Sequence, residues 1–167
     1  MNLTAKFAAT AVIAALIGAG TFAWLRTEPA PQVQFTRLTG GSFSTADLRG
    51  KVVLVNFWAT SCETCVHEMP KMVETYNKFA PRGYEMVAVA MSYDHPNYVA
   101  QFAQKNKLPF TVVLDSDGSI SKGFGNIMVT PTTYLIDRRG NIIKQYLGEP
   151  KWDEFHALVD RALSDPV

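Results

Sequence analysis

Short apolar runs rich in β-branched residues recur after residue 50 and predict the strands of a sheet. The run Val52–Trp58 is almost entirely apolar, as is typical of a central strand covered on both faces. Further strands are predicted at residues 84–91, 110–114, 132–136 and 142–147. The last two flank a loop with Gly140 at its tip, which indicates a β-hairpin.

A second period, with apolar residues three or four positions apart, predicts a helix directly after the first strand. From Cys62 onward this period is carried by Cys65, Met69, Met72, Val73 and Tyr76. Pro70 lies within the helix and is expected to kink it, because proline lacks an N–H and clashes with the preceding turn.

Asp94 and Pro96 are expected to open another helix, which extends to about residue 105. A turn at residues 115–118 leads to a short helix, and residues 151–163 form a last helix with one apolar stripe. Before the first strand, a stretch around Gly40 suits a β-hairpin. Strands alternating with helices predict an α/β fold with a mixed sheet and helices on both faces.

The first 26 residues form a separate block. Phe7–Leu25 is a run of 19 residues without a charge, and as a helix it would span about 28 Å, close to the hydrocarbon core of a bilayer. We expect residues 1–26 to be an N-terminal transmembrane anchor, with a cleaved signal peptide as the alternative. Lys6 favours an orientation with the N-terminus inside. Residues 27–33 are expected to be a linker, and residues 34–167 the folded domain.

Charges outside this block are balanced. With Lys6, Arg26 and Glu28 set aside, 14 basic residues accompany 14 acidic ones. The count gives no electrostatic reason to expect nucleic acid or anionic lipid as a partner of the folded domain. The hydrophobic content of 47% is that of a globular protein with a substantial core.

The two cysteines of the chain, Cys62 and Cys65, lie where the first strand gives way to a helix. At a helix start, unpaired backbone N–H groups and the helix dipole favour the thiolate, which is the nucleophilic form. This spacing predicts thiol–disulfide exchange, in which Cys62 attacks a substrate disulfide and Cys65 resolves the mixed disulfide.

Other uses of the two cysteines fit less well. A zinc site would have only Cys62, Cys65 and His67 nearby, one ligand short of the usual four. Haem attachment requires a histidine directly after the second cysteine, where Val66 stands. A purely structural pair of core cysteines remains as the plainest alternative.

The segment from Val55 to Pro70 resembles the active-site region of membrane-anchored, TlpA/ResA-type thioredoxin-like proteins. The likeness continues through residues 83–89 and 129–137 and, with the anchor, covers nearly the whole chain. It implies a thioredoxin fold with an N-terminal β-hairpin extension and a central strand–helix insertion. It implies further that Pro131 is cis and faces the cysteines, with Thr130 and Trp58 among the groups that bind substrate.

Glu68 matches an acidic residue that this family places near the active site. It follows Cys65 by one helical turn, so a partly buried carboxyl could exchange a proton with that thiol. Asn56 stands where cytosolic thioredoxins carry a buried aspartate, which favours Glu68 for this role. The alternative is a surface glutamate.

The resemblance implies an exported thiol–disulfide oxidoreductase of the bacterial inner membrane, with its catalytic domain in the periplasm or outside the membrane. Glu63, between the cysteines, opposes thiolate formation and favours a reductant. Its substrates would be disulfides of exported proteins, for example in cytochrome c maturation or copper-site assembly, and a membrane thiol transporter would supply electrons. No cofactor and no metal is expected. The alternatives are a copper-handling module that uses both thiolates and a peroxiredoxin-like peroxidase.

Overall fold

A strand that is buried along its whole length lies at the centre of the fold. The computed structural model describes residues 28–166, and within them β4 (Val52–Trp58) pairs in parallel with β5 (Tyr84–Ala90) and antiparallel with β7 (Thr132–Ile136). The sheet has the order β1-β8-β7-β4-β5-β6. The other strands are β1 (Glu28–Pro29), β2 (Gln34–Thr36), β3 (Ser42–Ser44), β6 (Thr111–Leu114) and β8 (Asn141–Leu147).

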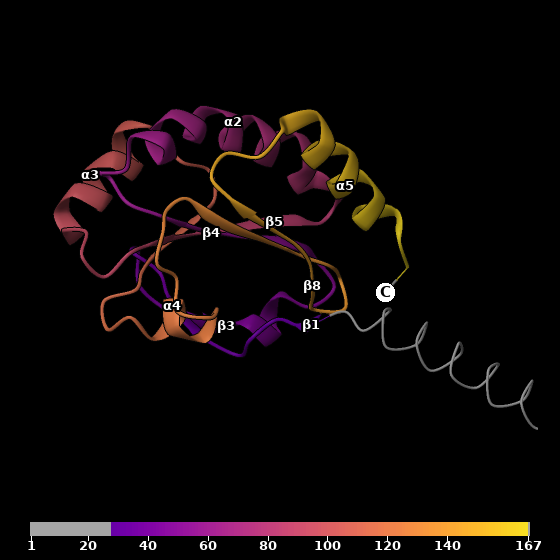
Figure 1. Ribbon diagram of the computed structural model, residues 1–167, viewed down its shortest axis with the longest axis horizontal. Helices are drawn as coiled ribbons and strands as arrows, with labels where there is room; N and C mark the ends of the chain where they lie inside the picture. The colour runs from indigo at the N-terminus through magenta and orange to yellow at the C-terminus, as the bar shows by residue number, and fades with distance from the viewer. Residues whose placement is uncertain (1–27, 167) are drawn as a thin grey trace, which may run out of the picture.

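Three long helices cover one face of this sheet (Figure 1). They are α2 (Glu63–Phe79), α3 (Pro96–Lys105) and α5 (Trp152–Ser164). The opposite face is covered by the β2–β3 hairpin, the 3-10 helix η1 (Thr45–Leu48) and the short helix α4 (Ser119–Gly123). A further 3-10 helix, η2 (Ala80–Arg82), follows α2.

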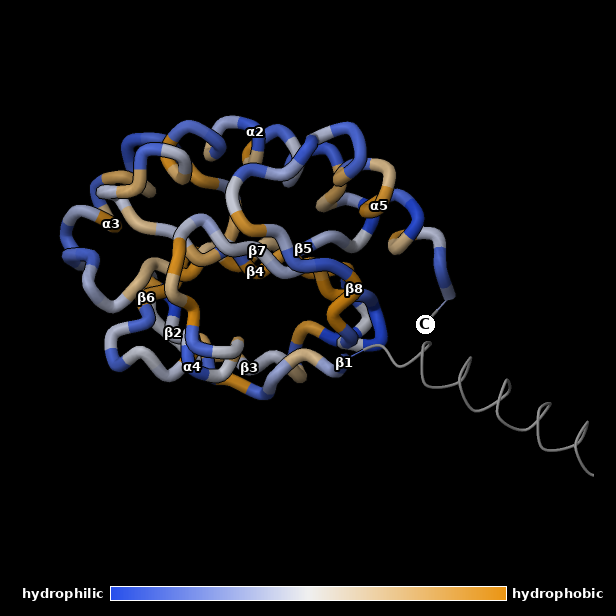
Figure 2. Tube along the Cα trace, viewed as in Figure 1, coloured by the Kyte–Doolittle hydropathy of each residue, from blue (hydrophilic) through white to orange (hydrophobic). Residues whose placement is uncertain are grey.

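The alternation of β4 divides the core into two clusters. Val52, Leu54 and Trp58 point toward the long helices, whereas Val53 and Val55 point toward the hairpin and α4. The trace in Figure 2 follows this division, with apolar residues along the strands and hydrophilic residues on the outer sides of α2 and α5. Burial on both faces explains why β4 carries an apolar run rather than an alternating pattern.

The order of elements confirms a thioredoxin-like α/β fold. One half is β4–α2–β5 and the other is β7–β8–α5, while α3, β6 and α4 lie between them. The predicted N-terminal hairpin is the β2–β3 pair, in which Phe35 lies opposite Phe43. α2 runs through Pro70, and the expected kink there stays a prediction.

The sheet begins earlier in the chain than the hydrophobic pattern predicts. Residues 28–30 were expected to belong to a linker, but Glu28 and Pro29 pair with Ile142 and Asn141 of β8, and Ala30 is buried. Backbone pairing carries no signal in side-chain hydropathy, which explains the difference. The predicted anchor at residues 1–26 lies outside the described residues. Between residues 28 and 166, none of the helices has the length and apolar character needed to cross a bilayer.

Candidate active site

The cysteine pair lies where the loop after β4 enters α2. Cys62 is the N-cap residue of α2 and is partly exposed, whereas Cys65 lies in the first turn and is fully buried. The two form a disulfide with a Cα–Cα distance of 5.2 Å. Their unequal exposure fits the predicted division of roles, because only Cys62 is accessible to a partner's disulfide.

Groups at the start of α2 also favour negative charge on the Cys62 sulfur. Its Sγ accepts a hydrogen bond from the backbone N–H of Cys65 at 3.2 Å, and the carbonyl of Cys62 accepts the first helical bond from Val66. In the reduced protein, that N–H and the positive end of the helix dipole would stabilise negative charge on this sulfur.

A buried carboxylate holds the turn that precedes Cys62. Asp94 accepts hydrogen bonds from the backbone N–H of Thr60 at 2.6 Å and from its hydroxyl at 2.7 Å. The predicted helix is confirmed as α3, which begins at Pro96 and ends at Lys105, but its N-cap is His95, which accepts the bond from the Asn97 N–H, and not Asp94. The position of Asp94 directly after β5 could have indicated this contact, since the carboxyl ends of parallel strands meet at one edge of a sheet.

The Thr130–Pro131 peptide bond is cis, as the resemblance implies. Because Phe57 lies opposite Thr132 in the β4–β7 ladder, the residues before β7 continue alongside the turn that leads to Cys62. Thr130 is partly exposed, and its hydroxyl lies 3.5 Å from the hydroxyl of Tyr93. Pro131 itself is buried, whereas Thr130 is partly exposed, and the expected substrate contact by these two residues stays a prediction.

Trp58 does not fit its expected role. Its side chain is fully buried and packs on Phe102 of α3, with ring centroids 5.1 Å apart. A direct contact between Trp58 and a substrate is therefore excluded in this structure. The residue belongs to the core beneath the active site, because its alternation along β4 points it inward.

Glu68 is fully buried, so it is not a surface glutamate. Its Oε1 accepts a hydrogen bond from the Asn56 side-chain amide at 3.1 Å, and the same amide group donates to the Thr133 hydroxyl at 2.9 Å. Asn56 and Thr133 are direct cross-strand neighbours of β4 and β7. This contact joins α2 to β4, which leads to Cys62, and to β7, which begins directly after Pro131.

The environment of Glu68 favours its neutral form. Burial raises the pKa of its carboxyl from 4.5 to about 7, and the nearby charge of Glu149 adds to this effect, while the hydrogen bond from Asn56 opposes it. The other oxygen, Oε2, is buried without a hydrogen-bond partner in the described part of the chain. A group with this pKa can both accept and donate a proton at neutral pH.

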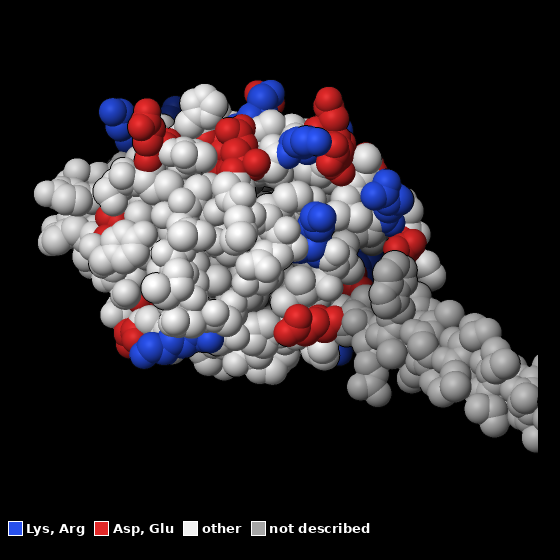
Figure 3. Space-filling model, viewed as in Figure 1, with Lys and Arg blue, Asp and Glu red and all other residues white. Residues whose placement is uncertain are grey.

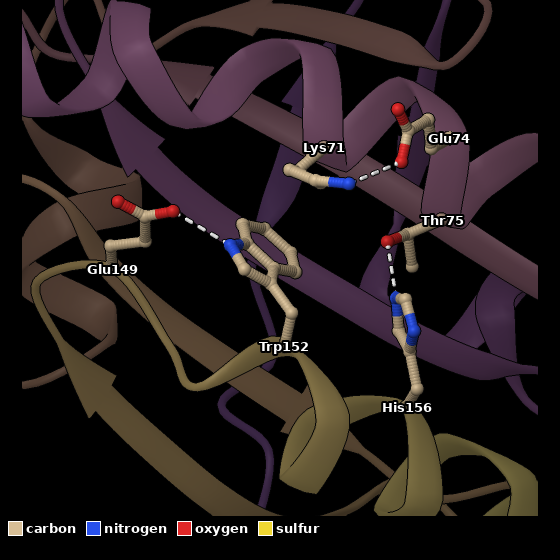
Figure 4. Close-up of polar contacts among 6 residues, drawn as sticks. All are labelled: Lys71, Glu74, Thr75, Glu149, Trp152 and His156. Carbon is tan, nitrogen blue, oxygen red and sulfur yellow. Dashed lines mark hydrogen bonds and ion pairs between the residues drawn. The ribbon is translucent and has the colours of Figure 1, made fainter.

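Glu149 is held next to this site by α5 and α2. Its carboxylate accepts a hydrogen bond from the Trp152 indole N–H at 2.6 Å (Figure 4) and lies 3.5 Å from the His67 ring. A second contact joins the same helices, because the His156 ring lies 2.8 Å from the Thr75 hydroxyl. The sequence alone did not indicate Glu149, which is distant from the cysteines along the chain.

No metal centre is evident in the part of the chain that the structure describes. Between residues 28 and 166, no three His, Cys, Asp or Glu side chains lie close enough together to hold an ion. His67 is exposed and faces Glu149.

Comparisons with known proteins point to the same chemistry. A family model described as Redoxin matches residues 26–162. The chain is 37% identical over 121 residues to the thiol–disulfide oxidoreductase ResA of Bacillus thuringiensis subsp. konkukian, an alignment that covers 72% of this chain and 68% of that protein. ResA of Geobacillus thermodenitrificans is 36% identical over 119 residues, covering 71% and 67%.

Solved structures agree with these matches. A thiol:disulfide interchange protein of the thioredoxin family from Chlorobium tepidum superposes with a TM-score of 0.75 at 30% identity, covering 83% of this chain and 98% of that one. StoA from Bacillus subtilis superposes with a TM-score of 0.66 at 25% identity, covering 77% and 96%.

We expect Asp94→Asn to make the Cys62–Cys65 couple more oxidising. The substitution removes a negative charge that is hydrogen-bonded to the turn before Cys62, so the thiolate and hence the reduced form gain stability. Equilibration of the purified protein with glutathione measures the reduction potential. Asp165→Asn, at an exposed residue directly after α5, is the matched control and should leave the potential unchanged. An unaltered potential in Asp94→Asn would show that the carboxylate acts only on loop stability.

Glu68 should make the stability of the fold depend on pH. Its pKa is higher in the folded than in the unfolded protein, so its stabilising contribution is complete below about pH 4.5 and is lost as pH rises to about 7. The free energy of unfolding should fall by about 3 kcal/mol over this range from this group alone. Urea unfolding of Glu68→Gln should lack that fall, and equal pH profiles in the two proteins would contradict the assignment.

Proposed function

This chain belongs to the Redoxin family and is a ResA-type thiol–disulfide oxidoreductase, and from that premise we propose that it reduces disulfide bonds of exported proteins at a membrane surface. The observation that carries the proposal is the arrangement of the cysteine pair, with a partly exposed Cys62 at a helix N-terminus, a buried Cys65 and a buried carboxyl one turn further on.

The reaction transfers two electrons from the dithiol to a substrate disulfide. The Cys62 thiolate attacks one substrate sulfur, and the other leaves as a thiolate that takes up a proton. Cys65 then loses its proton and attacks the Cys62 sulfur. The Cys62–Cys65 disulfide forms, and the second substrate thiolate is released. The reduced protein is restored by an external dithiol.

Glu68 is the group that takes the proton from Cys65 in this scheme. Both residues are fully buried on the same side of α2, one helical turn apart, so bulk water has little access to the thiol. The carboxylate form, which accepts a proton, is populated above about pH 7 because burial has raised the pKa of Glu68. The Asn56 amide, which also donates to the Thr133 hydroxyl, holds the carboxyl in place.

Acidic groups near the cysteines support a reducing rather than an oxidising role. Glu63 follows Cys62 directly, and the Asp94 carboxylate binds the preceding turn. Negative charge at these positions opposes the Cys62 thiolate and so destabilises the reduced form, which makes the couple a better electron donor.

The N-terminal block supports a place of action at a membrane. The uncharged run Phe7–Leu25 suits an inner-membrane anchor with the N-terminus inside, which would put the cysteines in the periplasm or outside the membrane. A membrane thiol transporter would then be the electron donor. Disulfides of exported proteins, such as those in cytochrome c maturation or copper-site assembly, would be the substrates.

Glu68→Gln should slow the resolving step near neutral pH. The glutamine side chain keeps the acceptor for the Asn56 amide but cannot take up a proton, so the inflection near pH 7 in the rate of substrate reduction should disappear. Stopped-flow measurement with a disulfide-bonded peptide gives the rate at each pH. Glu74→Gln, on the exposed side of α2, is the control. An unchanged rate–pH profile in Glu68→Gln would remove the proton-transfer role.

The reduction potential of the Cys62–Cys65 couple decides the direction of electron flow. We expect a value near or below about −250 mV, in the range of thioredoxin-type reductants. Equilibration with dithiothreitol followed by thiol alkylation measures it. A value near about −120 mV would instead identify an oxidant and reverse the proposed direction.

A further inference from the structure

The loop between β8 and α5 brings a second carboxyl to the active site. Asn56 lies opposite Thr133 in the β4–β7 ladder, and Thr133 lies opposite Tyr146 in the β7–β8 ladder. Glu149 follows Tyr146 by three residues. The sheet therefore places this loop at the end where the Asn56 amide binds Glu68.

Two contacts fix the Glu149 carboxylate against the helices. Its Oε1 accepts the Trp152 indole N–H at 2.6 Å, and Figure 4 shows this edge of the indole turned toward Glu149. Its Oε2 lies 3.5 Å from the ring of His67, which directly precedes Glu68 in α2. The indole is itself held on α5, where it packs against Phe155 with ring centroids 6.0 Å apart. The Glu149 side chain is in contact with both helices and keeps only 30% of its surface exposed.

The backbone of this loop is held on both sides of Glu149. The Gly148 N–H donates to the carbonyl of the cis-proline Pro131 at 2.8 Å, and Pro150 is buried. Glu149 therefore cannot turn far from α2 without breaking these contacts, which makes its charge a fixed part of the site.

Other charges near Glu149 mostly pair with one another. Figure 3 shows Lys, Arg, Asp and Glu side chains close together over α2 and α5, so charges of both signs meet there. Besides His67, the titratable side chains around Glu149 on α2 and at the start of α5 are Lys71, Glu74, Lys151, Asp153, Glu154 and His156.

The pairings within this set leave Glu149 as the charge that acts on Glu68. Lys71 pairs with Glu74 at 2.8 Å. Lys151 pairs with Glu154 at 3.1 Å. Asp153 is exposed to water, and His156 contacts the Thr75 hydroxyl. The negative charge of Glu149, by contrast, raises the pKa of the Glu68 carboxyl.

We propose that Glu149 is a positioning residue that acts through Glu68: held by the Trp152 indole, its negative charge keeps Glu68 protonated in the oxidised protein, so that Glu68 can donate this proton to Cys65 during re-reduction. The inference rests on the proton-transfer role of Glu68 in the proposed function. Its physical basis is that two carboxylates close together resist double ionisation, and the buried one is the one that stays neutral.

Re-reduction of the disulfide is the step that uses this proton. A thiolate of the external dithiol attacks the Cys62 sulfur, the Cys62–Cys65 bond breaks, and Cys65 leaves as a buried thiolate. Glu68 donates its proton to that thiolate and becomes a carboxylate. The second donor thiol loses its proton to solvent and attacks the donor sulfur of the mixed disulfide, so that Cys62 leaves as a thiolate. The donor is now a disulfide and has given up two electrons.

Glu149 therefore affects the two half-reactions in opposite directions. Substrate reduction uses the carboxylate form of Glu68, whereas re-reduction uses its protonated form. Removal of the Glu149 charge increases the carboxylate fraction at a given pH, which speeds substrate reduction and slows re-reduction. A simple loss of packing at the same place would not change the two rates in opposite directions.

Glu149→Gln tests this assignment, because glutamine keeps an acceptor for the Trp152 indole and loses the charge. Stopped-flow rates of both half-reactions are measured against pH, with a disulfide-bonded peptide as substrate and dithiothreitol as donor. Substrate reduction at about pH 6 should be about two- to threefold faster than in the unaltered protein, and re-reduction at about pH 8 slower by a similar factor. Both inflections should move to lower pH. Glu154→Gln, which removes an exposed carboxylate five residues further on, is the matched control and should leave both profiles unchanged.

Trp152→Phe keeps an aromatic ring against Phe155 but removes the N–H that holds Glu149. Both profiles should shift in the same direction as in Glu149→Gln, by a smaller factor. No shift in this variant would overturn the part of the proposal that assigns the holding of Glu149 to Trp152.

The unaltered protein and Glu68→Gln separate failure of this inference from failure of the proposed function. Unmoved inflections in Glu149→Gln, or equal slowing of both half-reactions, would overturn the role of Glu149 and leave the proposed function intact. An inflection that persists in Glu68→Gln, or a peptide disulfide that is not reduced at all, would overturn the proposed function and the role of Glu149 with it.

Discussion

The pairing of β4 on both of its edges is the constraint on which the active site depends. β5 and β7 flank this strand in fixed register, so three separate chain segments meet at its carboxyl end. β4 leads to Cys62, β5 leads to Asp94, and β7 begins directly after the cis Pro131. A one-residue slip of β4 would turn Asn56 to the other face and break its hydrogen bonds to Glu68 and Thr133.

Glu68 shows how the fold converts burial into chemistry. A buried carboxyl resists ionisation, so the folded protein loses stability at neutral and alkaline pH, where the unfolded chain ionises more readily. The same resistance brings its proton exchange into the neutral range, where a thiol partner can use it. The Asn56 amide limits the effect, because it donates a hydrogen bond to the carboxyl and to Thr133 at once. Burial and this hydrogen bond therefore shift the pKa of Glu68 in opposite directions.

The two ends of the sheet carry different chemistry. The disulfide and the cis-proline occur at one end, and β1 pairs with β8 at the other. β4 runs between these two ends, so the residues of the redox site are separate from those where β1 joins the sheet.

The sequence by itself determined the strands, the main helices, the role of the cysteines and the family, because these depend on local periodicity and on a motif contiguous in the chain. It also indicated Glu68, through its spacing from Cys65. Only the tertiary structure decided that Trp58 is core, that Asp94 binds Thr60 and that Glu28 belongs to the sheet. Each of these results depends on contacts between residues far apart in the sequence, which no local pattern records.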